Sequence, residues 1–301
     1  FTNKRKRARS AMLNVANKLL GTDWGDDTLI IGTSGRYEFK NKGIDVFLES
    51  LNRLSRDKNL KKNVLAFINV PGWVGEPRAD LQERLKSKNQ FDTPLEVPYI
   101  THWLHNMSHD QVLDTMKYLD MANRPQDKVK VIFVPCYLDG KDGIFNKEYY
   151  DMILGQDLSV YASYYEPWGY TPLESVAFRV PTITTDLAGF GLWVKSLKNQ
   201  NGLDDGVESC FFKKRLLRKS SNIPEPGNIR PSCGEDGVRK IRPLTLADGF
   251  KPGSLRRQVQ TANAGKQAQV GQCSVDFVGH LLILGVRKPA LLQAGFRVSF
   301  I

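Results

Sequence analysis

The chain has 301 residues, enough for one large domain or two of modest size. Its formal net charge of +11 would by itself favour a nucleic-acid or membrane partner. From Cys210 onward, however, 16 Lys and Arg stand against 5 Asp and Glu, which leaves 27 of each sign in residues 1–209. The basic character therefore belongs to the last third of the chain, and we do not expect nucleic acid to be the partner of the rest.

The four cysteines are Cys136, Cys210, Cys233 and Cys273, and no two of them have Cys-x-x-Cys spacing. This usage favours a reducing compartment and indicates neither a disulfide framework nor a zinc site. The longest apolar run, residues 281–286, is far shorter than the roughly 20 residues that a membrane span needs. We expect a cytoplasmic protein with no membrane partner.

Strand-like and helix-like segments alternate along the first 208 residues, which predicts an α/β fold with a Rossmann-like parallel sheet and helices on both faces. Strands are expected over residues 28–32, 63–68, 129–135, 158–161 and 180–185. Helices are expected from the N-terminus to residue 20 and over residues 44–56, 79–88, 108–123, 149–155 and 173–178. The side chains expected to face the core at helical spacing are Met12, Val15, Leu19, Leu20, Ile44, Phe47, Leu48, Leu51 and Leu54.

Residues 163–174, which we call the acidic segment, hold Glu166 and Glu174 in a strand–loop–helix arrangement. Loops at the carboxyl ends of parallel strands bind ligands, and a helix N-terminus there suits a phosphate. The segment thus favours a phosphorylated ligand rich in hydroxyls. The alternative is that Thr171 caps the helix, Glu174 closes a capping box and Glu166 is a solvated loop acid.

Residues 35–43, which we call the basic loop, carry Arg36, Lys40 and Lys42 between two glycines and before a helix. Fixed cations beside a helix N-terminus would suit a diphosphate. For Lys40 taken alone, plain contact with solvent is the favoured interpretation.

Two further clusters suggest sites that we do not favour. Five basic residues among positions 4–9 could form a localisation or nucleic-acid patch, but a solvated helix face is the simpler interpretation. His102, His105 and His109 lie close together, yet no carboxylate or cysteine spacing supports a closed metal site. A capping box of Ser108 with Gln111 is expected to start the helix that follows.

Two ordered motifs resemble those of eukaryotic-type glycogen synthases, which are retaining glycosyltransferases of the GT-B fold. One is the run of residues 164–172, Tyr-Tyr-Glu-Pro-Trp-Gly-Tyr-Thr-Pro, followed by a Pro-x-Ile-Thr-Thr strand and a Gly-Phe-Gly turn at residues 189–191. The other is the basic loop. The resemblance covers about residues 3–208. It implies the C-terminal, donor-binding half of the GT-B fold, and transfer of glucose from a nucleotide-diphosphate glucose to the non-reducing end of an α-1,4-glucan.

The resemblance also assigns roles to residues at matching positions. Arg36 and Lys42 would meet the donor's phosphates, and Glu166 would stabilise the reacting sugar. The donor-binding residues implied are Tyr149 on the base, Glu174 on the ribose, and Trp168, Gly169, Tyr170 and Thr171 around the pocket. No metal and no further cofactor is then needed. Arg179 stands where the family has a glycine, so we expect strain there if the position needs a positive φ.

The predicted organisation is a nucleotide-sugar-binding domain over residues 1–208 and a basic, non-native or disordered tail over residues 209–301. The abrupt start predicts a fragment without the N-terminal half, one that binds donor but transfers little or no glucose. A non-catalytic nucleotide-sugar-binding module is the alternative, and nucleic-acid binding through the tail is a weaker one. The sequence leaves open the choice between UDP- and ADP-glucose, the oligomeric state and any regulation.

Overall fold

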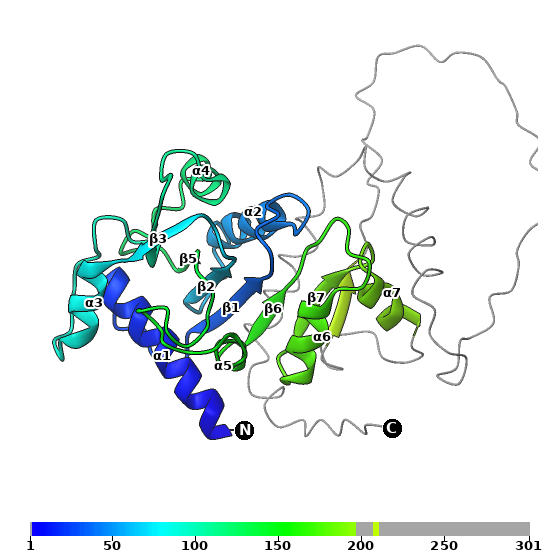
Figure 1. Ribbon diagram of the computed structural model, residues 1–301, viewed down its shortest axis with the longest axis horizontal. Helices are drawn as coiled ribbons and strands as arrows, with labels where there is room; N and C mark the ends of the chain where they lie inside the picture. The colour runs from blue at the N-terminus through cyan, green and yellow to red at the C-terminus, as the bar shows by residue number, and fades with distance from the viewer. Residues whose placement is uncertain (1, 197–206, 211–301) are drawn as a thin grey trace, which may run out of the picture.

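The computed structural model describes residues 2–196 and 207–210, so the predictions for residues 211–301 lie outside the described part. Its centre is a six-stranded sheet in the order β5-β2-β1-β6-β7-β8, in which every pair of neighbours is parallel (Figure 1). The strands are β1 (Leu29–Ser34), β2 (Val64–Asn69), β5 (Val129–Val134), β6 (Leu158–Val160), β7 (Thr182–Thr185) and β8 (Val207–Cys210). The predicted α/β class with a parallel sheet is confirmed. β8 crosses the domain boundary that we expected at residue 208.

Helices cover both faces of the sheet (Figure 1). Along β2, Val64, Ala66 and Ile68 pack into one apolar cluster, whereas Leu65 and Phe67 pack into the other. This alternation is the period of two expected for a strand buried on both faces. The first cluster includes residues of α2 (Ile44–Ser55) and α4 (Gln111–Tyr118), and the second includes residues of α1 (Thr2–Leu20), α3 (Ala79–Lys86) and α5 (Tyr149–Leu154).

The apolar positions predicted from helical spacing all face the core. Met12, Val15, Leu19 and Leu20 of α1 are buried, as are Ile44, Phe47, Leu48, Leu51 and Leu54 of α2. The expectation of a solvated basic face on α1 holds only in part. Arg9 is 8% exposed and pairs with Asp157 at 2.7 Å, which Arg5 also contacts at 3.3 Å. Asp157 lies directly before β6, so these arginines fasten α1 to the sheet.

Both predicted capping boxes are wrong. The N-cap of α4 is Asp110, whose carboxylate accepts hydrogen bonds from the backbone N–H groups of Val112 and Leu113. α6 (Tyr170–Ala177) begins after Gly169 at φ 102°, with no side-chain cap. Thr171 is therefore already inside the helix and cannot be its cap.

Besides β8, two features were not predicted. β3 (Val74–Pro77) and β4 (His102–Leu104) form a separate antiparallel pair. α7 (Gly189–Ser196) follows β7 where we expected only a turn. None of the helices in the described part of the chain is long and apolar enough to cross a membrane.

Candidate active site

The basic loop and the acidic segment meet at the carboxyl ends of β1 and β6, which are neighbours in the sheet. Gly43 makes the contact possible: its φ is 67°, and a Cβ there would stand 1.9 Å from the carbonyl oxygen of Ala162. The backbone N–H of Tyr164 donates to the carbonyl of Asn41 at 2.9 Å. The two motifs are thus joined through their backbones.

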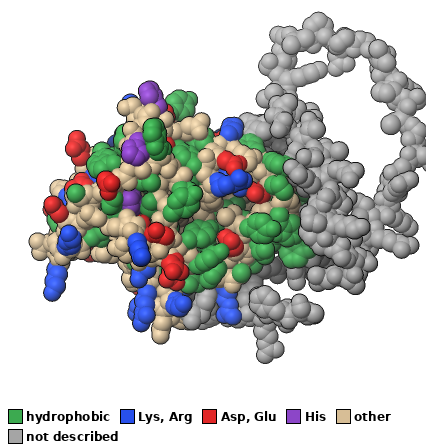
Figure 2. Space-filling model, in the orientation of Figure 1, with side chains coloured by type: hydrophobic (Ala, Val, Ile, Leu, Met, Phe, Trp, Pro, Cys, Tyr) green, Lys and Arg blue, Asp and Glu red, His purple; other side chains and the backbone are tan. Residues whose placement is uncertain are grey.

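Lys42 and Glu166 form an ion pair across this junction, from Nζ to Oε2. Their side chains are 13% and 17% exposed, so the pair is screened only partly by water. The backbone of Glu166 is held as well, because its carbonyl accepts a hydrogen bond from the N–H of Gly189 at 3.1 Å. On the face seen in Figure 2, acidic and basic side chains meet beside α2 and β6. The arrangement sets one cation against one carboxylate at a ligand-binding edge of the sheet.

The other two cations of the basic loop point elsewhere. The Arg36 side chain is 75% exposed and contacts Glu38 Oε1 at 3.0 Å. Lys40 pairs with Asp45 at 2.5 Å and lies 5.2 Å from the ring centre of Tyr164. Arg36 is exposed, and among the described residues its side chain pairs only with Glu38 of the same loop, so it can turn toward a ligand. Lys40 belongs to a surface cluster, as expected.

The predicted base-stacking residue, Tyr149, is half-buried at the start of α5. Its hydroxyl shares a 2.7 Å hydrogen bond with Ser34 at the end of β1, and burial raises its pKa above the ordinary value. The next residue, Tyr150, is more exposed, and its hydroxyl donates to Glu174 Oε1 at 3.2 Å. The sequence reasoning missed Tyr150; its only signal was its position beside Tyr149.

The predicted pocket residues separate into two groups. Trp168 is partly buried, with its ring centroid 6.1 Å from those of Phe190 and Trp193 on α7. Gly169 is buried and turns the chain into α6, whereas Tyr170 is 70% exposed at the first position of that helix. Thr171 lies in the same turn. Trp168 therefore packs the acidic segment against α7, whereas the Tyr170 side chain lies at the protein surface.

The strain expected at Arg179 is present. Its φ is 58°, in the left-handed region that favours glycine. Arg179 follows the C-cap residue of α6 and leads toward β7, so the turn keeps a backbone conformation that suits glycine at a cost of about 1–2 kcal/mol.

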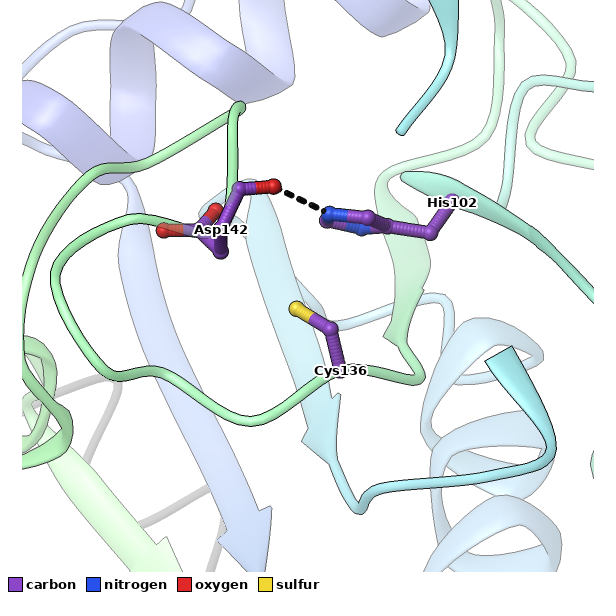
Figure 3. A group of neighbouring side chains, drawn as sticks. All are labelled: His102, Cys136 and Asp142. Atoms are coloured by element: carbon purple, nitrogen blue, oxygen red, sulfur yellow. Dashed lines mark hydrogen bonds between the residues drawn. The ribbon is translucent and has the colours of Figure 1, made fainter. Parts of the chain in front are cut away.

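One group of side chains has the chemistry of a metal site, namely His102, Cys136 and Asp142, whose ligand atoms lie within 4.8 Å of one another (Figure 3). Of the three clustered histidines, only His102 belongs to it; His105 instead lies 5.2 Å from Trp73, ring to ring. The His102 nitrogens bond to the Asp142 carbonyl at 2.7 Å and to the Thr101 hydroxyl at 2.9 Å.

The Asp142 side chain of this cluster is also held by hydrogen bonds. The Asp142 carboxylate accepts hydrogen bonds from the backbone N–H groups of Ile144, Phe145 and Asn146. Burial raises the pKa of the Cys136 thiol to about 12. The cluster is accounted for as a structural link between β4 and the loop after β5, and we assign no metal to it.

Comparison with known protein families identifies the family of this chain. A family model described as glycogen synthase matches residues 21–80 and 81–209. The chain belongs to the glycogen synthase family.

Glycogen synthases of other organisms are similar to the chain over part of their length. The glycogen [starch] synthase of Neurospora crassa is 32% identical over 238 residues, covering 60% of this chain and 33% of that protein. Isoform 2 of Saccharomyces cerevisiae is 30% identical, covering 60% and 34%. The human liver enzyme is 31% identical, covering 56% and 31%. The chain thus spans about a third of the length of these relatives.

Solved structures align with the chain more loosely. WaaG, a glycosyltransferase involved in lipopolysaccharide biosynthesis, is 12% identical with a TM-score of 0.36, covering 98% of this chain and 52% of its own. Anabaena Alr3699/HepE, solved with UDP and glucose, is 10% identical with a TM-score of 0.35, covering 98% and 53%. The fold assignment rests on the sheet topology above and not on these alignments.

Proposed function

We propose that this glycogen synthase relative is the donor-binding part of a retaining glucosyltransferase, which transfers glucose from a nucleotide-diphosphate glucose to the non-reducing end of an α-1,4-glucan. The observation that carries the proposal is the Lys42–Glu166 ion pair, which joins the two family motifs at the carboxyl ends of β1 and β6. A diphosphate bound at this junction would take Lys42 as its partner and leave Glu166 beside the sugar.

The chemistry of the reaction fits these side chains. As the bond between the sugar and the diphosphate breaks, negative charge grows on the departing phosphate, and fixed cations stabilise that charge. Lys42 would meet it directly and Arg36 would turn from Glu38 to join. The N–H groups of Tyr170 and Thr171, in the first turn of α6, add donors and the positive end of the helix dipole. We propose that these groups neutralise the diphosphate without a metal ion.

The carboxylate has a complementary role. The sugar ring gains positive character at its anomeric carbon, and Glu166 would stabilise that charge while Lys42 is engaged with phosphate. Glu174 would accept hydrogen bonds from the ribose hydroxyls, and Tyr149 would lie against the base. We propose a cytoplasmic location from the cysteine usage and leave oligomerisation open.

A non-catalytic nucleotide-sugar-binding module is the second candidate, because the chain spans only about a third of its relatives. Two measurements on the same sample test the proposals. UDP-glucose or ADP-glucose should raise the melting temperature, and the one that raises it more is the donor. Transfer of labelled glucose to glycogen should be negligible. Transfer at ordinary enzyme rates would overturn the module, and no stabilisation by either donor would overturn both proposals.

A further inference from the structure

Tyr150 contacts two residues on one side of α6: Glu174 within the helix and Phe178, the C-cap residue. Glu174 and Phe178 are four positions apart, so they lie on the same side of this helical segment. The Tyr150 ring stacks on Phe178 with centroids 5.1 Å apart and planes 19° apart. Its hydroxyl donates to Glu174 Oε1 at 3.2 Å. One side chain from α5 thus contacts both residues.

These two contacts fix the direction of the Glu174 carboxylate. The near-parallel stack restricts the Tyr150 ring, so its hydroxyl points toward Glu174 without further ordering. Only Oε1 is engaged; no group in the described part of the chain donates a hydrogen bond to Oε2. The second carboxylate oxygen is therefore available to a ligand.

We propose that Tyr150 is a positioning residue for the nucleotide: it holds one oxygen of Glu174 so that the other accepts hydrogen bonds from the ribose hydroxyls of a nucleoside diphosphate. The inference rests on the proposed function, because it takes Glu174 as the ribose contact. It adds a residue that lies outside both family motifs.

The charge state of the pair suits this role. Glu174 raises the pKa of the Tyr150 phenol, so the hydroxyl keeps its proton and stays a donor at neutral pH. The competing interpretation is that Tyr150 merely packs α5 against α6. The two interpretations differ in one respect, since a packing residue would affect every nucleotide equally, whereas a positioning residue acts only through the ribose hydroxyls.

The test is a calorimetric titration of UDP and of its 2′,3′-dideoxy analogue into the wild-type chain and the variants Tyr150→Phe, Glu174→Gln and the double variant. Tyr150→Phe keeps the stack and removes only the hydroxyl. We expect it to weaken UDP binding about three- to tenfold, as for the loss of one hydrogen bond, and to leave binding of the dideoxy analogue unchanged. The double variant should bind UDP as Glu174→Gln does, because Tyr150 acts through Glu174.

Tyr118→Phe is the matched control, since Tyr118 is 86% exposed at the end of α4. It should bind both nucleotides as the wild type does. The inference is overturned if Tyr150→Phe binds UDP unchanged, or if it loses affinity for UDP and the dideoxy analogue to the same degree. A wild-type chain that binds neither UDP nor UDP-glucose would instead overturn the proposed function itself.

Discussion

Lys42 and Glu166 are 124 residues apart in the chain, yet their side chains form an ion pair where two neighbouring parallel strands end. Both side chains are less than one-fifth exposed. The pair joins the basic loop to the acidic segment. A diphosphate would compete with Glu166 for the Lys42 ammonium, so the same contact that closes the site also prepares it for an anion.

Replacing Lys42 by glutamine should weaken UDP binding about ten- to hundredfold. This is the loss expected for one charge-assisted hydrogen bond of about 1.5–3 kcal/mol. Isothermal titration at fixed salt measures it. Lys40→Gln is the matched control, because Lys40 lies in the same loop but is 72% exposed and paired with Asp45. Equal losses in the two variants would mean that only the net charge of the loop matters.

Replacing Glu166 by glutamine should have the opposite effect on UDP. The substitution frees Lys42 and removes a negative charge that faces the phosphates, so UDP should bind about three- to tenfold more tightly. The same titration detects this. Weaker UDP binding by Glu166→Gln would show that the carboxylate does not oppose the diphosphate and would contradict the assigned arrangement.

Gly43→Ala should destabilise the fold strongly. A Cβ would stand 1.9 Å from the Ala162 carbonyl oxygen, and the φ of 67° adds the cost of a left-handed conformation. We expect a loss of roughly 3 kcal/mol, or a fall in melting temperature of about 6–12 °C. Gly25→Ala is the control, since the nearest atom to its Cβ would be 3.8 Å away. A Gly43→Ala variant that melts with the wild type would refute the close contact of the loops.

His102 should make stability depend on pH. Burial lowers its pKa, opposed by the hydrogen bond and charge of Asp142, so the folded protein keeps the ring neutral at pH values where the unfolded chain is already protonated. Stability should therefore be constant above the unfolded pKa of about 6.5 and fall as the pH drops below it. Urea unfolding between about pH 5 and 8 measures this dependence. A His102→Gln variant should lose part of it, and an unchanged slope would exclude His102 as the cause.

Much of the fold could be predicted because its signals are local. The apolar faces of α1 and α2 follow the helical period, and the strands are short apolar runs between helices. The caps were harder, because Ser108 and Asp110 are both good N-cap residues. The carboxylate of Asp110 also accepts a hydrogen bond from the hydroxyl of Tyr37 at 2.7 Å, a contact 73 residues away that no local pattern reveals.

The candidate site likewise combines local features, which the sequence predicts, with contacts between distant segments, which it does not. The motifs placed Arg36, Lys42 and Glu166 on loops at strand ends, and the sheet order brought Lys42 and Glu166 into contact. Arg36 instead contacts Glu38, and the sequence alone does not specify this side-chain direction. The burial of Arg9 against Asp157 and the contact of Tyr150 with Glu174 also join distant segments. These pairings depend on how helices pack on the sheet and have no short-range signature.

We propose that the junction of the basic loop and the acidic segment binds a nucleotide sugar through its diphosphate. A crystal structure of the chain with UDP-glucose tests it most directly. We predict a phosphate oxygen about 3 Å from Lys42 Nζ, with Lys42 released from Glu166 and Glu166 facing the glucose. A complex in which the nucleotide lies elsewhere, or in which Lys42 remains paired with Glu166, would contradict the account.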